Sequence, residues 1–388
     1  MSYDFDKITN RRGTNSLKWD EALENELPMW VADMDFETAP AVKRAVIKTA
    51  ESGIYGYSTT PNLYFEAISD FFFDNYRYRM NPENIAFSTG VVAALSSLVR
   101  KLTTPAENVL IQAPVYNIFY NSILNNGRNV LSSDLIYENG EYRIDFSDLE
   151  KKLADKQTTL MILCNPHNPI GKIWDRETLK KIGRLCYENG VTVISDEIHC
   201  PITRPGHEYI PFASVDEICE NISISCVSAS KAFNLAGIAA AAVYSKNKQL
   251  FHKAWRALNT DEVGEPNIFA MNASIAAYRE GREWLSELRT YLFENRDAAE
   301  KYIKENIPKC HPVYANATYL MWLDVSSYTD NSEEFAKELR RKTGLFVSDG
   351  KKYGKTGAGF LRINLATQRK NVMHAMELLS KFIKENYS

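Results

Sequence analysis

Short apolar runs alternate with helix-like segments from about residue 84 to residue 245. Each run has the length of a strand, and several stop at turn-forming pairs such as Asn165-Pro166. We therefore predict buried strands. They are Ile85 to Ser88, Val109 to Gln112, Thr159 to Cys164, Val191 to Ser195, Ile222 to Val227 and Ala239 to Tyr244.

The segments between these strands carry helix signals. Thr89 to Lys101 is an apolar helix, and Asp175 is a suitable N-cap for a helix that runs to Tyr187 and stops at Gly190. Strands that are apolar on both faces and separated by helices indicate an α/β fold with a mainly parallel sheet covered on both sides.

The pattern changes near residue 284, where apolar residues follow a helical period until shortly before Pro308. We expect this long helix to join a large domain, residues 49–284, to a smaller α+β domain made of residues 1–48 and 285–388. The predicted elements of the smaller domain are strands at Tyr319 to Val325, Leu345 to Val347 and Phe360 to Asn364, and helices at Ser332 to Lys342 and Asn371 to Asn386.

Composition narrows the classes of function. The 388 residues carry a formal net charge of −3, so there is no basic surplus to bind nucleic acid or an anionic membrane. The N-terminus lacks the features of a secretory signal, and no run reaches the roughly 20 apolar residues that span a bilayer. The six cysteines are scattered, which fits reduced thiols in a cytoplasmic protein, and we expect no metal site.

Ser228-Ala229-Ser230-Lys231 is the most informative segment. A lysine amine becomes a nucleophile for Schiff-base chemistry when burial or a nearby positive charge lowers its pKa. Ser228 and Ser230 could donate to a phosphate, so one segment could hold both ends of pyridoxal phosphate. The alternative is an exposed loop.

Other polar groups also follow predicted strands, where ligands of open α/β sheets bind. Gly90, Val91 and Val92 open a helix and could present N–H groups to a phosphate, or form an ordinary tight turn. Asn168 could donate to a phenolate-like oxygen, or belong to a Pro-Gly turn.

Asp196 follows a buried strand, where it would pair with a pyridinium nitrogen or cap a helix. His199 could donate to the same ring oxygen as Asn168. Tyr116 could stack on a flat ring or belong to the core. Arg362 lies in an apolar strand and needs a partner, either a substrate carboxylate or an internal carboxylate.

The chain resembles fold type I pyridoxal-phosphate enzymes of the class I/II aminotransferase-like group, and within it the cystathionine β-lyase (C–S lyase) branch. The resemblance implies a mixed, mainly parallel seven-stranded sheet. It rests on Ala32-Asp33-Met34-Asp35-Phe36, Tyr55-Gly56-Tyr57-Ser58, Asn168 to Lys172, Ile194 to His199, Ser228 to Asn234 and Gly357 to Arg362.

This resemblance implies a role for each candidate. Lys231 forms the Schiff base, Asp196 holds the pyridine nitrogen, Asn168 with His199 binds the ring oxygen, Tyr116 stacks on the ring and Arg362 grips the substrate carboxylate. Gly90, Val91, Val92, Ser228 and Ser230 hold the phosphate. Tyr57 reaches the phosphate of the other subunit of a homodimer.

One position departs from the group. Aminotransferases of this kind commonly carry an arginine eight residues after the lysine, where this chain has Ala239. The missing charge favours α,β-elimination of L-cystathionine or a related cysteine S-conjugate. The alternatives are an aminotransferase and a regulatory protein that binds the cofactor without turnover.

Overall fold

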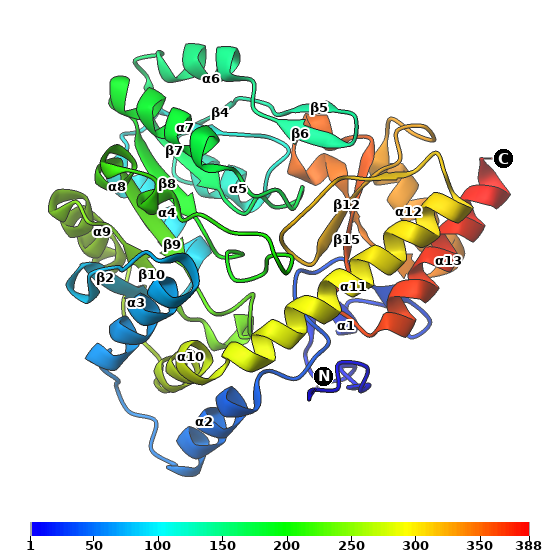
Figure 1. Cartoon of the computed structure of the whole chain (residues 1–388), viewed down its shortest axis with the longest axis horizontal. Coiled ribbons are helices and arrows are strands. Elements are labelled where there is room, and N and C mark those ends of the chain that lie inside the picture. Colours follow the sequence, from blue (N-terminus) through cyan, green and yellow to red (C-terminus); the bar gives the residue numbers. More distant parts are fainter. Residues whose placement is uncertain (1, 388) are drawn as a thin grey trace.

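The computed structural model describes residues 2–387, and its larger sheet has seven strands in the order β2-β10-β9-β8-β7-β3-β4 (Figure 1). Only β10 runs antiparallel to its neighbours in this sheet. The strands are β2 (Ile85–Ser88), β3 (Asn108–Ile111), β4 (Asn129–Ser132), β7 (Thr158–Cys164), β8 (Thr192–Asp196), β9 (Ser223–Val227) and β10 (Ala241–Tyr244). The expected mixed, mainly parallel sheet is confirmed.

Helices cover both faces of this sheet, and successive residues of one strand pack into different layers. Ile194 of β8 belongs to a core shared with α4 (Val91–Leu102), α5 (Ile118–Leu124) and α9 (Lys248–Thr260). Its neighbour Val193 packs with α6 (Phe146–Leu153), α7 (Arg176–Glu188) and α8 (Glu217–Ile222). Burial on both faces explains why the strands are continuous apolar runs.

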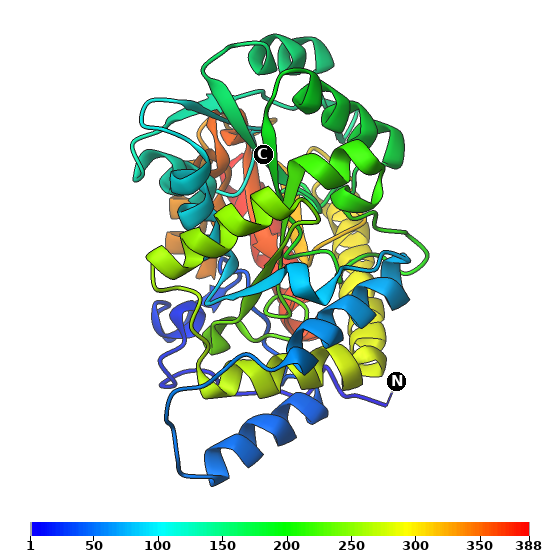
Figure 2. The ribbon, with the colours of Figure 1, turned by 90° about the vertical axis from the view of Figure 1, so that its left-hand side faces the viewer.

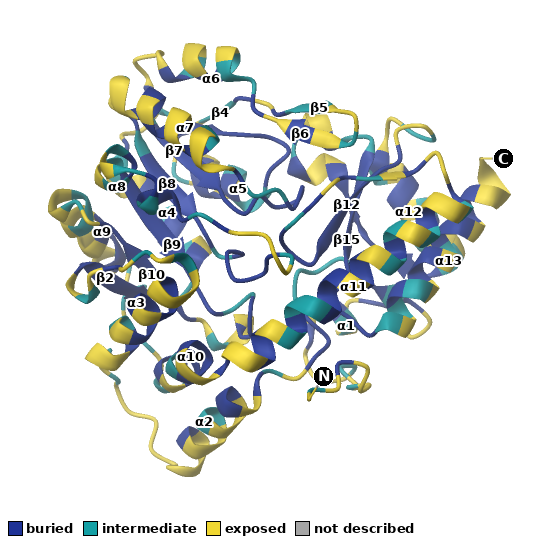
Figure 3. Ribbon diagram, in the orientation of Figure 1, coloured by how far each residue is buried: buried dark blue, intermediate teal, exposed yellow. Residues whose placement is uncertain are grey.

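A third group of helices lies beside the β2–β10 end of the sheet. Helix α10 (Ile268–Glu280) packs against α2 (Pro40–Glu51) and α3 (Asn62–Tyr76). Figure 2 shows that α2 and the chain that follows it project from the body, and Figure 3 shows that this connection is exposed.

The C-terminal unit contains a second, antiparallel sheet in the order β11-β12-β15-β14. Its strands are β11 (His311–Pro312), β12 (Leu320–Asp324), β14 (Ser348–Asp349) and β15 (Phe360–Asn364), and its helices are α11 (Arg282–Asn306), α12 (Ser332–Thr343) and α13 (Arg369–Asn386). Helix α11 runs from α10 to this unit (Figure 1), and a long helix was predicted there. The expected domain boundaries fall inside α2 and α11.

The N-terminal segment joins this unit through β1 (Leu27–Pro28), which pairs with β13 (Leu345–Phe346). The remaining elements are helix α1 (Leu17–Asp20), the hairpin of β5 (Ile136–Glu138) and β6 (Glu141–Arg143), and 3₁₀ turns at Pro82–Asn84, Phe212–Ser214, Ala236–Ile238, Gly350–Tyr353 and Lys355–Gly357. None of the helices described between residues 2 and 387 has the length and apolar character to cross a membrane.

Local signals set two helix ends correctly and one strand start incorrectly. The Asp175 side chain accepts from the N–H of Thr178 at 2.7 Å, and Gly190 adopts a left-handed φ of 68° after the helix. The strand predicted from Ala239 begins at Ala241. A 3₁₀ turn precedes it, and Ala239 itself has a φ of 54°, which a strand does not allow.

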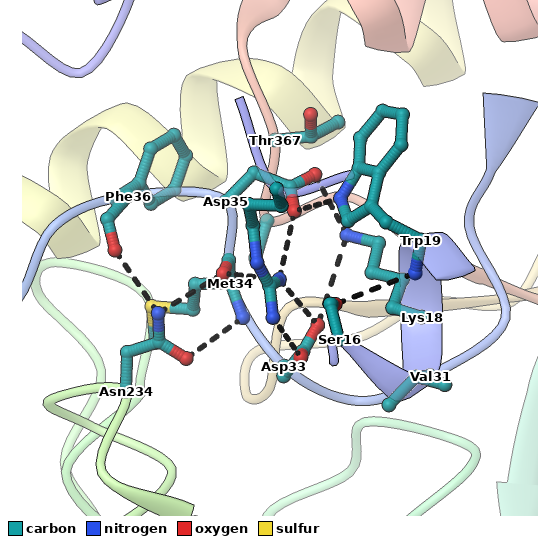
Figure 4. A network of polar contacts seen from close by, with 12 residues as sticks. Ser16, Lys18, Trp19, Val31, Asp33, Met34, Asp35, Phe36, Asn234 and Thr367 are labelled. Atoms are coloured by element: carbon teal, nitrogen blue, oxygen red, sulfur yellow. Dashed lines mark hydrogen bonds and ion pairs between the residues drawn. The ribbon is translucent and has the colours of Figure 1, made fainter. Parts of the chain in front are cut away.

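A buried ion cluster holds the N-terminal segment in place (Figure 4). The Asp35 carboxylate lies 2.7 Å from the Lys18 amine and 3.0 Å from the Arg11 guanidinium, and accepts from the Trp19 indole at 2.7 Å. Burial alone would raise the pKa of Asp35, but the Lys18 charge and the hydrogen bonds outweigh it and lower that pKa.

Replacing Asp35 with alanine tests this cluster. Because the Lys18 side chain is fully buried, its charge would lose its strongest partner. We expect Asp35→Ala to lower the free energy of unfolding, measured in urea, by about 3–5 kcal/mol. The control is Glu188→Ala, which breaks an exposed pair with Arg184 and should cost less than about 1 kcal/mol. Equal losses in both variants would contradict the argument.

Candidate active site

A cavity of about 550 Å³ opens between the large sheet and the C-terminal unit. Its floor comes from residues at the carboxyl ends of β7 and β8 and from the loop after β9. Parallel strands end at one edge of a sheet, so residues distant in sequence meet there. Ten of the sequence-predicted residues line it: Gly90, Val91, Val92, Tyr116, Asn168, Asp196, His199, Ser230, Lys231 and Arg362.

Lys231 brings an amine to the middle of this cavity. Its Nζ donates to the carbonyl oxygen of Ala32 at 2.7 Å. Burial, and then the positive charge of Arg362, lower the pKa of Lys231 to about 8. A substantial fraction of this amine is therefore neutral near physiological pH, which is the form that attacks a carbonyl carbon.

Asp196 ends β8 and is buried. One hydrogen bond within residues 2–387 reaches its carboxylate, from the N–H of Ile198 at 3.1 Å. Burial raises the pKa of Asp196 to about 6, although that hydrogen bond and the Lys231 charge oppose the rise. Asp196 is not a helix cap, the other role that the sequence allowed, because a turn and not a helix follows β8. The carboxylate can accept a protonated nitrogen from a ligand.

His199 and Asn168 line the same cavity as this carboxylate. The His199 ring is buried, its Nδ1 has no hydrogen-bond partner in the described part of the chain, and burial followed by the charges of Lys231 and Arg362 lowers its pKa to about 3. The ring is therefore neutral. The Oδ1 of Asn168 accepts from Arg362 at 3.2 Å, which leaves its amide hydrogens available to a ligand oxygen.

Arg362 projects from β15 with no carboxylate beside it. Its guanidinium donates to Asn168 and, at 2.9 Å, to the carbonyl of Trp30, and it lies 4.9 Å from the centre of the Tyr353 ring. None of the ion pairs between residues 2 and 387 includes it, and its Nε has no partner there. The alternative of an internal salt bridge does not apply, so the group can bind an external carboxylate.

The start of α4 gives the cavity backbone N–H groups that suit an anion. Helix α4 begins after Gly90, and no side chain caps its first N–H groups. Ser230 lines the wall nearby, whereas Ser228 lies behind it, with its hydroxyl 2.6 Å from the carbonyl of Ala240. Ala239 also lines the cavity, where an arginine would have supplied charge.

Two aromatic candidates have different positions. Tyr116 lines the cavity and is partly buried, with its ring edge against Phe119. Tyr57 lies outside the cavity of its own chain and is fully exposed on the connection between α2 and α3. Tyr57 therefore does not belong to the cavity lining of its own chain.

The sequence interpretation missed one wall of the cavity. Residues 30–32 and Leu17 of the N-terminal segment line it, as do Ser348, Lys352 and Tyr353 of the C-terminal unit. Ala32 stood in a string that carried the family resemblance, which was the one available signal. The contacts themselves are tertiary.

The residues present fit pyridoxal phosphate. A buried carboxylate with a single hydrogen bond matches the ring nitrogen, and the uncapped start of α4 matches the phosphate. The neutral His199 ring and the Asn168 amide, which line the cavity, match polar ring substituents. Lys231 completes the set as the amine for the aldehyde.

Comparisons with known proteins agree with this geometry. A protein of Bacillus subtilis (strain 168) named cystathionine beta-lyase PatB is 42% identical over 365 residues, which cover 93% of this chain and 94% of that protein. A solved structure of the PLP-bound C-S lyase from Staphylococcus hominis is 33% identical, with a TM-score of 0.92 and coverage of 98% of both chains.

A third similar protein is cystalysin from Treponema denticola, whose crystal structure contains a pyridoxal 5'-phosphate cofactor. It is 29% identical, has a TM-score of 0.95 and covers 99% of this chain and 100% of its own. The family profile described as "Aminotransferase class I and II" matches residues 25–379. The chain therefore belongs to the class I and II aminotransferase family.

Proposed function

We propose that this protein is a pyridoxal-phosphate-dependent carbon–sulfur lyase. It splits L-cystathionine, or a related cysteine S-conjugate, into a thiol, pyruvate and ammonia; cystathionine gives homocysteine. The observation that carries the proposal is that one cavity holds an amine of lowered pKa, a buried carboxylate and a guanidinium without a carboxylate partner. The relatives named as cystathionine β-lyase and C–S lyase support it.

The proposed cofactor contacts follow the residue chemistry. When bound, pyridoxal phosphate supplies an aldehyde that takes up an amino group and a protonated ring that withdraws electrons from it. Lys231 would hold the aldehyde end, Asp196 the ring nitrogen, Asn168 and His199 the ring oxygen, and Tyr116 one face. The phosphate would lie on Gly90, Val91, Val92 and Ser230, with Ser228 behind them.

The chain's own groups would then carry out the elimination. Arg362 binds the α-carboxylate and fixes the substrate, a positioning effect. The neutral Nζ of Lys231 removes the α-proton as a general base. A sulfur leaving group needs no separate strong acid, because a thiol has a pKa near about 8.5. Water then completes the release of pyruvate and ammonia.

Two rival functions remain distinct. An aminotransferase would use the same residues, but it needs a 2-oxo acid as acceptor. A regulatory protein that only binds the cofactor would not need Arg362 free of internal carboxylates. The arrangement at Arg362 favours an enzyme that binds amino acids.

The first test is turnover without an acceptor. Purified protein loaded with pyridoxal phosphate should release pyruvate and free thiol in equal amounts from L-cystathionine alone, because elimination needs no second substrate. Lys231→Ala is the control and should produce neither. Consumption of L-cystathionine only after a 2-oxo acid is added, with no release of free thiol, would favour the aminotransferase.

The second test follows the Lys231 amine. Because burial and Arg362 lower its pKa to about 8, the neutral amine increases as pH rises. The rate at which cofactor-free protein captures pyridoxal phosphate, followed by absorbance, should rise with pH to half its maximum near that value. Arg362→Gln removes a charge that lowers the pKa, so its midpoint should lie at higher pH. A midpoint near the ordinary lysine value of about 10.4 would contradict this.

We also propose a homodimer with shared sites. Ile54, Tyr55 and Tyr57 are exposed at 77%, 59% and 111% on the projecting connection after α2, which is unusual for apolar side chains on a free surface (Figure 3). A second copy would cover them and receive Tyr57 at its phosphate site. The cytoplasmic location and the division into domains 49–284 and 1–48 with 285–388 stay predictions.

Mixing two variants tests the shared site. Tyr57→Ala should weaken retention of pyridoxal phosphate about tenfold, the effect of one lost hydrogen bond to a charged group. Lys231→Ala should bind it without a covalent link. Subunits exchanged between the two should regain one intact site per mixed dimer, so lyase activity should exceed the sum of the separate samples. A monomeric mass by light scattering would contradict the proposal.

A further inference from the structure

Residues 30–36 form a segment, here called the strap, whose backbone is bound almost entirely by side chains. All seven carbonyl oxygens from Trp30 to Phe36 accept hydrogen bonds from side chains. Backbone carbonyls usually pair with other backbone groups. Here side chains from several distant elements replace a strand ladder, and two of them belong to the proposed catalytic machinery.

The two machinery groups bind alternate carbonyls. Arg362 donates to Trp30 at 2.9 Å, and Lys231 donates to Ala32 at 2.7 Å. The Tyr319 hydroxyl shares the Ala32 carbonyl at 3.0 Å. The chain bends at Val31 and Ala32, between and at these two acceptors. One short piece of backbone therefore binds both the guanidinium and the amine.

The intervening carbonyls are held by one amide. The Nδ2 of Asn364 donates to Val31 and to Asp33, both at 2.6 Å, and its Oδ1 accepts from the N–H of Ala366. Asn364 stands two residues after Arg362 on β15, so both side chains leave the same face of that strand. Any shift of the strap relative to Asn364 would also shift it relative to Arg362.

A second asparagine holds the other end of the strap to the lysine loop (Figure 4). Asn234, three residues after Lys231, accepts from the N–H of Met34 at 3.1 Å and donates to Met34 and Phe36, both at 3.0 Å. Its φ of 56° is left-handed, a conformation that asparagine adopts more readily than most residues. The backbone favours asparagine or glycine here, and the three hydrogen bonds of the side chain select asparagine.

We propose that the strap is a spacer that sets the position of the Arg362 guanidinium relative to the Lys231 amine, and that Asn364 and Asn234 are its positioning residues. The Ala32 carbonyl also accepts a hydrogen bond from the Lys231 amine when that amine is free. A neutral amine that donates one N–H there keeps its lone pair for the substrate's α-proton. The inference rests on the proposed function for the roles of Lys231 and Arg362.

The experiment measures ligand binding rather than turnover. The holoenzyme with pyridoxal phosphate is titrated with L-alanine, which has no leaving group, and with L-alaninamide, which lacks the carboxylate. Binding is followed by the cofactor's visible absorbance. Asn234→Gly keeps the left-handed backbone but removes all three bonds to the strap. We expect L-alanine to bind about tenfold more weakly to this variant and L-alaninamide to bind unchanged.

The matched control is Asn139→Gly, which removes an exposed asparagine with a left-handed φ of 52° far from the strap. It should leave the affinity for both ligands unchanged. If Asn234→Gly yields too little folded protein, Asn234→Asp keeps the acceptor for Met34 and loses both donors, with the same expectation. Asn364→Asp loses both donor bonds, to the carbonyls of Val31 and Asp33, and should likewise weaken the binding of L-alanine alone.

A double variant separates positioning from general damage. If the strap acts through Arg362, adding Asn234→Gly to Arg362→Lys should weaken L-alanine binding by less than the product of the two single effects. Three results would overturn the inference. They are a double variant whose loss of L-alanine affinity equals the product of the two single losses, an equal loss of affinity for L-alanine and L-alaninamide in Asn234→Gly, and no loss for either ligand. A wild-type protein that binds L-alanine but releases no pyruvate from cystathionine would refute the lyase proposal and leave the strap intact.

Discussion

Burial of unpaired charge is the constraint on which this site depends. Asp196 and Arg362 lie inside the protein, and neither has an opposite charge of the protein in contact within the described residues. Taking such groups out of water is unfavourable unless a ligand supplies the missing partner. The same burial lowers the pKa of Lys231 and raises that of Asp196, so one physical effect prepares both groups.

The surrounding fold makes this arrangement tolerable. The sheet is buried on both faces. The carboxyl ends of the parallel strands β7, β8 and β9 meet at one edge. The opposite wall is the strap, which the Asp35 ion cluster anchors from behind (Figure 4). Asp196 from the large sheet and Arg362 from β15 therefore line one cavity, and no ion pair joins them within the described residues.

The proposed phosphate site differs in charge from the proposed carboxylate site. Arg362 offers a full charge for a carboxylate, whereas α4 offers backbone N–H groups and the helix dipole, with Ser230 nearby. Ala239 leaves the proposed phosphate site without a guanidinium.

Local patterns in the sequence predicted six of the seven strands of the large sheet, the helix from Arg282 to Asn306, and the strand-end residues Asn168, Asp196 and Lys231. They missed β4, a short strand at the edge of the sheet whose residues are only partly buried. Apolar periodicity and short turn signals act over a few neighbours, so one chain suffices to find them. The predicted start of β10 was wrong, because the apolar residues before Ala241 belong to a 3₁₀ turn and to a residue with a left-handed φ. Tertiary structure alone decided that residues 30–36 form a wall of the site and that Arg362 meets a carbonyl rather than a carboxylate. Those contacts join residues hundreds of positions apart, and no local pattern encodes which distant side chain satisfies a buried backbone group.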